Sequence, residues 1–195
     1  LRGLSVTTIY TRYLTAPTTP SSKELYLRER QAIGKKQESA FLFNEQGGWE
    51  VTFRGARPVA DDVMERRNFS TLTSIFYILK YRLKEPGIIL QSKGADVWMN
   101  QPVEIVDITD SENRTVTVYF HKSTKLPLRQ FAVRRDRKTH DRFDEVTLYS
   151  KYRDIGGGIQ WPFTIERERD DEKIFQMYSE TVTANNDLTD DRFTL

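Results

Sequence analysis

The residues that could carry acid–base or metal chemistry in this chain are few and scattered. The 195-residue sequence contains two histidines, His121 and His140, and no cysteine. Neither histidine has a second histidine or a paired carboxylate at the spacing that a metal site needs. Asp141 follows His140, but no nucleophile motif of the Gly-x-Ser-x-Gly type accompanies the pair. We predict two turn histidines, with no catalytic residue, no metal site and no cofactor.

Acidic residues gather at three places, and a glycosidase needs two carboxylates placed on either side of a sugar. The clusters are Asp61-Asp62, Asp170-Asp171-Glu172 and Asp190-Asp191. They fall at an expected helix start, a hairpin turn and the C-terminal tail, where solvated charge is the ordinary role. We therefore predict a protein without enzymatic activity. An enzyme with a polar cleft is the alternative at this point.

One stretch, from Arg129 to Arg142, is strongly basic, with six basic residues against two acidic ones. Phe131 and Phe143 lie within or next to it, and aromatic residues interleaved with basic ones are typical of nucleic-acid surfaces. However, its centre, Arg135 to Lys138, reads as a hairpin turn, and no nucleic-acid motif surrounds it. We expect a solvated hairpin, with a docking surface for a protein or a lipid headgroup as the alternative, and no nucleic-acid partner.

Composition indicates a soluble globular protein. Hydrophobic residues make up 37% of the chain and charged residues 30%, and the net charge is only +2. No apolar run is long enough to span a membrane, and no signal peptide is present. Because the sequence has no initial Met and opens directly in a strand-like stretch, Leu4 to Tyr13, we expect that an export signal, and a first helix with it, were trimmed.

The elements that must position these residues are mostly strands. Between Thr115 and Ile165, four runs alternate apolar and polar residues and are separated by short turns, which predicts an antiparallel meander. Earlier runs at Glu24 to Arg30, Ser39 to Asn44 and Trp49 to Arg54 show the same alternation. After a helical interval, strand character returns at 88–90, 96–99 and 103–108. The last strand is expected at 173–183, followed by a terminal turn.

A helical segment interrupts this pattern at residues 59–83. Apolar residues recur there at spacings of three and four, the period of an amphipathic helix. They are Leu72, Ile75, Phe76, Leu79 and Leu83. Asp61 and Asp62 suit its N-terminus, Pro86-Gly87 ends it, and Asn68 to Ser70 is expected to break it, with Ser70 as a cap. The sequence therefore predicts a mainly β, single-domain chain of about ten or eleven strands in one curved, unclosed antiparallel sheet, with a helical lid around 59–83.

The high aromatic content, 12% of the chain, is the most informative feature for function. If the sheet curves, their inward members line one concavity, and a single helical segment leaves part of it unfilled. The predicted apolar cavity residues are Trp49, Phe53, Phe76, Leu79, Trp98, Tyr119 and Trp161. Arg54 and Arg129 are candidate headgroup or partner contacts near the rim. The alternative is a core filled by these side chains.

The second half of the chain also resembles a known family. Lys125-Leu126-Pro127-Leu128-Arg129, Tyr149 to Arg153, Gly156 to Gly158, Trp161-Pro162 and a tail from Asn185 to Phe193 follow one another in an order similar to that of the periplasmic lipoprotein-carrier superfamily, the LolA/LolB-like lipoprotein-sorting proteins. The resemblance implies an antiparallel half-barrel whose concave face is capped by helices, an apolar cavity for acyl chains, and transfer by lid displacement.

Two functions follow as hypotheses. The first is a non-enzymatic periplasmic carrier, peripherally associated with the outer membrane, that binds a lipid or the acyl chain of a lipoprotein between the sheet and the helical lid. The second is a cell-envelope interaction module of the same fold with a filled core, which binds a protein partner through a sheet edge or the basic hairpin.

Overall fold

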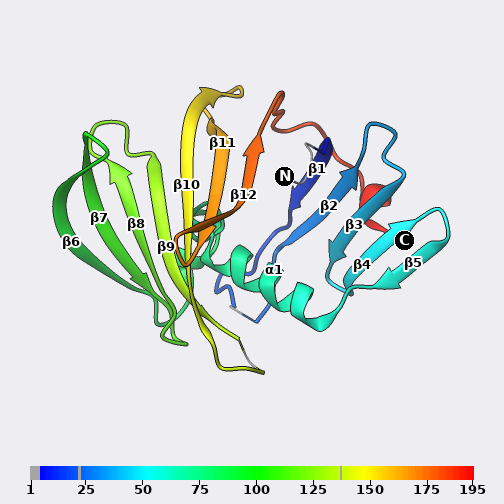
Figure 1. Ribbon diagram of the computed structural model, residues 1–195, viewed down its shortest axis with the longest axis horizontal. Coiled ribbons are helices and arrows are strands. Elements are labelled where there is room, and N and C mark those ends of the chain that lie inside the picture. Colours follow the sequence, from blue (N-terminus) through cyan, green and yellow to red (C-terminus); the bar gives the residue numbers. More distant parts are fainter. Residues whose placement is uncertain (1–4, 22, 137) are drawn as a thin grey trace. The chain divides into compact units, whose positions relative to one another are not determined.

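The chain folds into two antiparallel sheets with a small helical part. The computed structural model describes residues 5–21, 23–136 and 138–195, and in these it has twelve strands, two α-helices and two 3-10 helices (Figure 1). Two compact units can be separated: the residues up to Leu72 together with Asn185–Leu195, and Thr73–Ala184. The predicted class, mainly β, antiparallel and unclosed with one helical insertion, is confirmed. The single-domain assignment stays a prediction.

The first unit contains a five-stranded sheet in which each strand pairs with the next along the chain. Its strands are β1 (Thr7–Tyr13), β2 (Leu27–Ile33), β3 (Ser39–Asn44), β4 (Gly47–Thr52) and β5 (Gly55–Pro58). The strand at Ser39 to Asn44 is confirmed, whereas β5 was not predicted. Leu4, where we expected the first strand to start, lies outside the described residues.

Helix α1 (Asp61–Thr73) packs on one face of this sheet through its part up to Leu72. The Arg67 guanidinium lies 4.4 Å from the centre of the Phe43 ring. A Cβ atom at Gly48 would lie only 2.5 Å from the Met64 sulfur and 2.8 Å from the Phe43 ring. Glycine at position 48 is therefore what allows the helix to approach β4 this closely. We call this the α1 face.

The second unit contains a seven-stranded meander, as its sequence pattern predicted. Its strands are β6 (Ile89–Trp98), β7 (Gln101–Thr109), β8 (Thr115–His121), β9 (Pro127–Arg135), β10 (Arg142–Asp154), β11 (Gln160–Arg169) and β12 (Glu172–Tyr178). In Figure 1 they lie side by side in a curved row, with β6 and β12 as the open edges. The two short pieces predicted at 88–90 and 96–99 form one strand, because an irregularity between Ser92 and Gly94 breaks the alternation without breaking the pairing.

The expectation of one continuous sheet is therefore corrected to two. Strand β5 ends at Pro58, the helical insertion follows, and the pairing resumes with β6 and β7. The insertion itself is confirmed, as α1, α2 (Ile75–Lys80) and η1 (Arg82–Lys84). Its predicted break at Asn68 to Ser70 is wrong: α1 continues through these residues and the interruption lies at Ser74.

Candidate functional site

The helix-covered face of the second sheet carries a cluster of aromatic residues. The Phe76 ring of α2 meets Tyr149 of β10 edge-on, with ring centres 5.2 Å apart, and Trp161 of β11 at 5.0 Å. Ile75 and Ile78 of the same helix are fully buried, while Leu79 is 49% exposed. Of the predicted cavity residues, the structure thus brings Phe76 and Trp161 together and turns Leu79 toward solvent. We call this face the α2 face.

Gln130, on the central strand β9, explains why the helical insertion breaks at Ser74. Its side-chain Oε1 accepts a hydrogen bond from the Ile75 backbone N–H at 2.9 Å, and its Nε2 donates to the Thr73 carbonyl at 3.1 Å. Tyr149 also donates its hydroxyl to Gln130 Oε1, at 2.7 Å. A buried side-chain amide thus satisfies the backbone groups that the helix break exposes. Burial of the Tyr149 hydroxyl raises its pKa well above the ordinary value.

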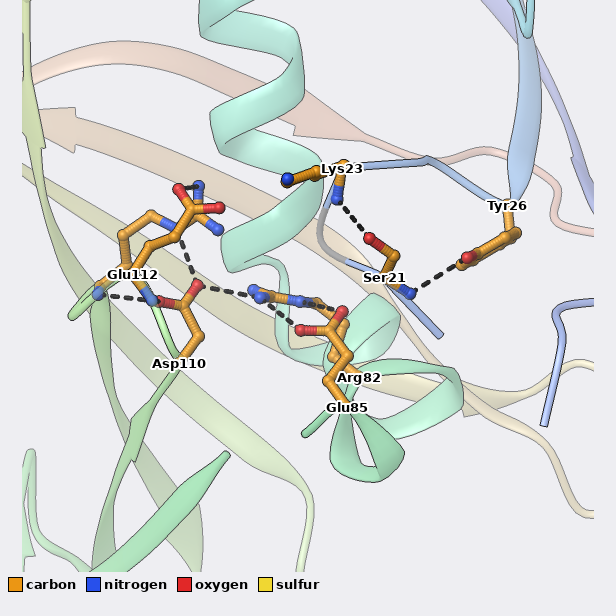
Figure 2. A network of polar contacts seen from close by, with 8 residues as sticks. Ser21, Lys23, Tyr26, Arg82, Glu85, Asp110 and Glu112 are labelled. Atoms are coloured by element: carbon orange, nitrogen blue, oxygen red, sulfur yellow. Dashed lines mark hydrogen bonds and ion pairs between the residues drawn. The ribbon is translucent and has the colours of Figure 1, made fainter. Parts of the chain in front are cut away.

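The other end of the helical segment is attached by a buried ionic network (Figure 2). Arg82 of η1 donates to Glu85 at 2.7 Å and to Asp110, which follows β7, at 2.9 Å. Asp110 also accepts from the Arg114 side chain at 2.7 Å and from the backbone N–H groups of Glu112 and Arg114 at 2.9 Å. Burial alone would raise the pKa of Asp110, but these donors outweigh it and hold the pKa below its usual value.

Strand β6 leaves apolar side chains uncovered on the α2 face. The register pairs Leu90 with Ile108 and Ile108 with Val116, so their side chains share one face. Val116 pairs with Ala132, two residues from Gln130, which places them on the α2 face. Ile108 and Val116 are buried, whereas Leu90 is 59% exposed, and Val97, on the same face, is 67% exposed. The covered apolar face therefore continues into an uncovered strip of β6, whose apolar members are Leu90, Ala95 and Val97, with Ser92 between the first two.

Trp98, Tyr119 and Arg129 lie on the opposite face of the same sheet. Tyr119 and Arg129 are cross-strand partners, and each is adjacent in sequence to a residue of the α2 face, Val118 and Gln130. The Arg129 guanidinium lies 5.0 Å from the Tyr119 ring centre, and Trp98 lies 6.4 Å from the same ring. These three predicted residues therefore do not share a lining with Phe76 and Trp161.

The remaining predicted residues belong to the first unit. Trp49 of β4 pairs with Leu42 of β3, on the face opposite α1. Phe53 and Arg54 lie in the turn between β4 and β5, where Phe53 is 87% exposed and the Arg54 guanidinium stacks 5.2 Å from its ring centre. Their roles as cavity and headgroup residues stay predictions.

The candidate chemical residues lie in turns. His121 ends β8, where its Nδ1 accepts backbone N–H bonds from Ser123 and Thr124 at 3.2 Å, and His140 is exposed in the turn after β9. Arg137, at the centre of the basic hairpin, lies outside the described residues. Among those described, no group of three or more His, Cys, Asp or Glu side chains is arranged to hold a metal ion.

Sequence reasoning missed Leu90, Val97 and Gln130, although part of the signal was present. Val116, Val118 and Phe120 were read as one face of a strand, and strict alternation then places Tyr119 on the other. The same alternation, carried across β7, would have selected Leu90 but not Val97, because the irregularity between Ser92 and Gly94 changes the face of the residues that follow it. The role of Gln130 depends on its hydrogen bond with Ile75, more than fifty residues away in sequence. No local sequence pattern predicts such a contact.

No protein-family model matches the chain, and no curated protein matches it. Solved structures do. A DUF1329 family protein from Desulfovibrio piger has a TM-score of 0.50 at 14% identity, covering 97% of this chain and 88% of that one. A LolA superfamily protein from Nitrosomonas europaea has a TM-score of 0.47 at 14% identity, with the same coverage. A structure described as an outer membrane lipoprotein-sorting protein domain from Vibrio parahaemolyticus has 0.48 at 10% identity, covering 82% and 74%.

These identities restrict the likeness to the fold. No helix of the described residues is both long and apolar enough to cross a membrane. The chain is similar in fold to the DUF1329 family protein.

Proposed function

We propose that this chain is a non-enzymatic carrier that binds the acyl chain of a lipid or lipoprotein on the α2 face of its second sheet. The observation that carries this proposal is the apolar strip of β6, where Leu90 is exposed beside buried Ile108 and Val97 is exposed beside Pro102 farther along the same face. An apolar surface that adjoins a covered core is where a hydrocarbon gains most from leaving water.

The strip has the dimensions and the chemistry for such a ligand. Leu90 and Val97 are seven positions apart in one strand, which corresponds to roughly 23 Å. Each methylene group that leaves water contributes about 0.8 kcal/mol, and a hydrocarbon needs no polar partner. Binding of this kind requires no catalytic group.

The helical segment acts in this proposal as a fixed wall beside the ligand. Gln130 holds the start of α2, and Arg82 holds the end of η1 through Asp110, both by buried polar contacts. Displacing the segment would leave these groups without partners, at about 1–3 kcal/mol for each neutral group and more for a charged one. The acyl chain therefore lies beside α2 rather than beneath it, and the transfer implied by the family resemblance proceeds without displacement of α2.

The proposal also includes the place of action. A chain of this class works in the bacterial periplasm, takes its acyl chain from one membrane and gives it to another, and touches membranes only peripherally. The LolA-like fold and the sequence resemblance support this part of the proposal.

A matched pair of variants tests the site. Leu90→Asp places a charge on the strip, whereas Ile89→Asp places one at the neighbouring position, which is 63% exposed on the opposite face. Titration with a fluorescent long-chain fatty acid should show saturable binding to the wild type, at least tenfold weaker binding to Leu90→Asp and little change for Ile89→Asp. Organic extraction of the purified protein followed by mass spectrometry should also recover lipid. Equal binding of the fatty acid by both variants would exclude the strip as the binding site.

One observation favours the interaction module instead. Under α2 the face is filled: Ile75, Ile78 and Val118 are essentially inaccessible to solvent. If extraction yields no lipid and the fatty acid does not bind the wild type, the strip is a docking surface for an envelope protein, and the carrier proposal fails.

A further inference from the structure

The C-terminal segment is bound like a peptide ligand on the first sheet. The 3-10 helix η2 (Asp190–Phe193) contacts the face of β1, β2 and β3 that is opposite the α1 face. We call this the tail face. Tail and sheet both belong to the first unit, although the whole second unit separates them in sequence.

An acidic side chain makes the first anchor of the tail. Asp190 Oδ1 accepts hydrogen bonds from the guanidinium groups of Arg12, at 2.6 Å, and of Arg28, at 2.5 Å. Arg28 is itself held by Glu45. Its Nε and Nη2 donate hydrogen bonds to the Glu45 carboxylate, at 2.9 Å and 2.7 Å. Because Glu45 fixes the orientation of Arg28, the two arginines form an anion site that is organised by the sheet.

An aromatic side chain makes the second anchor. Phe193 is only 1% exposed and is among the largest fully buried side chains of the described residues. Its carbonyl oxygen accepts a hydrogen bond from Asn44 Nδ2 at 2.9 Å, and the neighbouring Arg192 carbonyl accepts one from Arg30 at 3.4 Å. The sheet therefore binds the backbone of the tail by hydrogen bonds and also buries the Phe193 ring.

The spacing of the two anchors follows from the local helix. In a 3-10 helix, residues three apart lie on the same side, so Asp190 and Phe193 face the sheet together, although the Asp190 side chain stays largely exposed. Asp191 lies between them in sequence and is exposed. The Arg192 guanidinium stacks on Tyr10 of β1, 4.8 Å from the ring centre. An acidic residue followed three positions later by an aromatic one is thus the pattern that this face fits.

We propose that the tail face is a peptide-binding site for segments with an acidic-x-x-aromatic pattern, and that the chain's own tail occupies it in cis. The partner is a protein that presents the same pattern in a single helical turn. Tethering gives the tail a high effective concentration, so a partner engages only when it is abundant or when the tail is released. This inference goes beyond the carrier proposal and does not depend on it, because it concerns a different sheet.

Exchange of the tail tests this site. A protease recognition sequence placed between Ala184 and Thr189 allows the tail to be cut after folding, and a fluorescent peptide of residues 187–195 is then added. The cut protein should bind the peptide saturably, and the uncut protein should not. A peptide with Phe193→Ala should bind at least about tenfold more weakly, because it loses a buried ring. A peptide with Asp190→Asn should bind about two- to fivefold more weakly, because its ion pairs with Arg12 and Arg28 are partly exposed. Asp191→Asn is the matched control and should bind like the wild-type peptide.

Two results would overturn the proposal. One is a cut protein that keeps its circular dichroism spectrum but takes up no peptide. The other is uptake of the Asp190→Asn or Phe193→Ala peptide as strong as that of the wild type. If cutting unfolds the first unit before the peptide is added, the uncut chain with Asp190→Asn and Phe193→Leu replaces it: its weakened tail should yield to the wild-type peptide, and failure to do so contradicts the site. None of these results bears on fatty-acid binding.

Discussion

The two sheets differ in how their faces are covered. The first has α1 on one face and the C-terminal segment, with buried Phe193, on the other. The second has α2 and η1 on one face, where the covering stops short of Leu90 and Val97, and its opposite face carries half-exposed Tyr119. A sheet covered on both faces buries more of its apolar side chains, whereas the incompletely covered face leaves Leu90 and Val97 in contact with water.

The attachments also differ in kind. In the second unit, buried polar groups fix both ends of the helical segment, through Gln130 at the start and Arg82 at the end. In the first unit, the tail is fixed by partly exposed ion pairs around Asp190 and by one buried ring. Exposed pairs contribute little, typically below about 1 kcal/mol. The tail should therefore depend mainly on Phe193 and the helical segment on its polar network.

The largest effect should come from Arg82→Met. It leaves the buried carboxylates of Glu85 and Asp110 without the guanidinium between them, and breaking a buried pair in this way costs about 3–5 kcal/mol. Urea denaturation should show this loss in the free energy of unfolding. Arg66→Met removes an exposed pair with Asp62 and should change stability by less than about 0.5 kcal/mol. Similar effects of the two variants would remove the proposed difference between the attachments.

Phe193→Ala should rank second, at about 3 kcal/mol, because it empties a fully buried site. Phe53→Ala, at a position that is 87% exposed, is the control and should be nearly neutral. Thermal unfolding of both variants measures the contrast. If Phe193→Ala does not change the unfolding temperature, the tail does not contribute to the stability of the first unit.

A smaller effect is expected for Gln130→Ala, about 1–3 kcal/mol, since the Ile75 N–H, the Thr73 carbonyl and the Tyr149 hydroxyl lose a buried partner. Amide hydrogen exchange should report faster exchange at Ile75. Gln101→Ala, at an exposed position of β7, should leave that amide unchanged. Unaltered protection of Ile75 in Gln130→Ala would show that α2 is held by its apolar contacts alone.

The smallest predicted effect is a pH dependence. The pKa of Asp110 is below its ordinary 3.8 in the folded chain, so its contribution to stability is complete above that value and is lost as the pH falls through the lowered pKa. Asp110→Asn should flatten the decline of unfolding free energy on acidification. Acid titrations followed by Trp fluorescence compare the two, and parallel curves would assign the decline to other carboxylates.

The sequence predicted the parts of this fold that local patterns determine. Alternation placed β3 at Ser39 to Asn44, and the acidic pair at Asp61 marked the start of α1. It failed at Ser74, because the interruption there is stabilised by Gln130 from a distant strand. It also failed to separate Trp161 from Tyr119, because the aromatic residues were grouped by type before their faces were compared across the register.

The docking of the tail has a consequence for protein synthesis. Residues 190–193 leave the ribosome only after the whole of the second unit, which at about 5–20 residues per second takes several seconds or more. During that interval the nascent β1–β5 segment exposes the surface that later receives Phe193. Its final burial therefore follows the synthesis of the second unit, and chaperones that recognise hydrophobic nascent chains have their best opportunity in that interval.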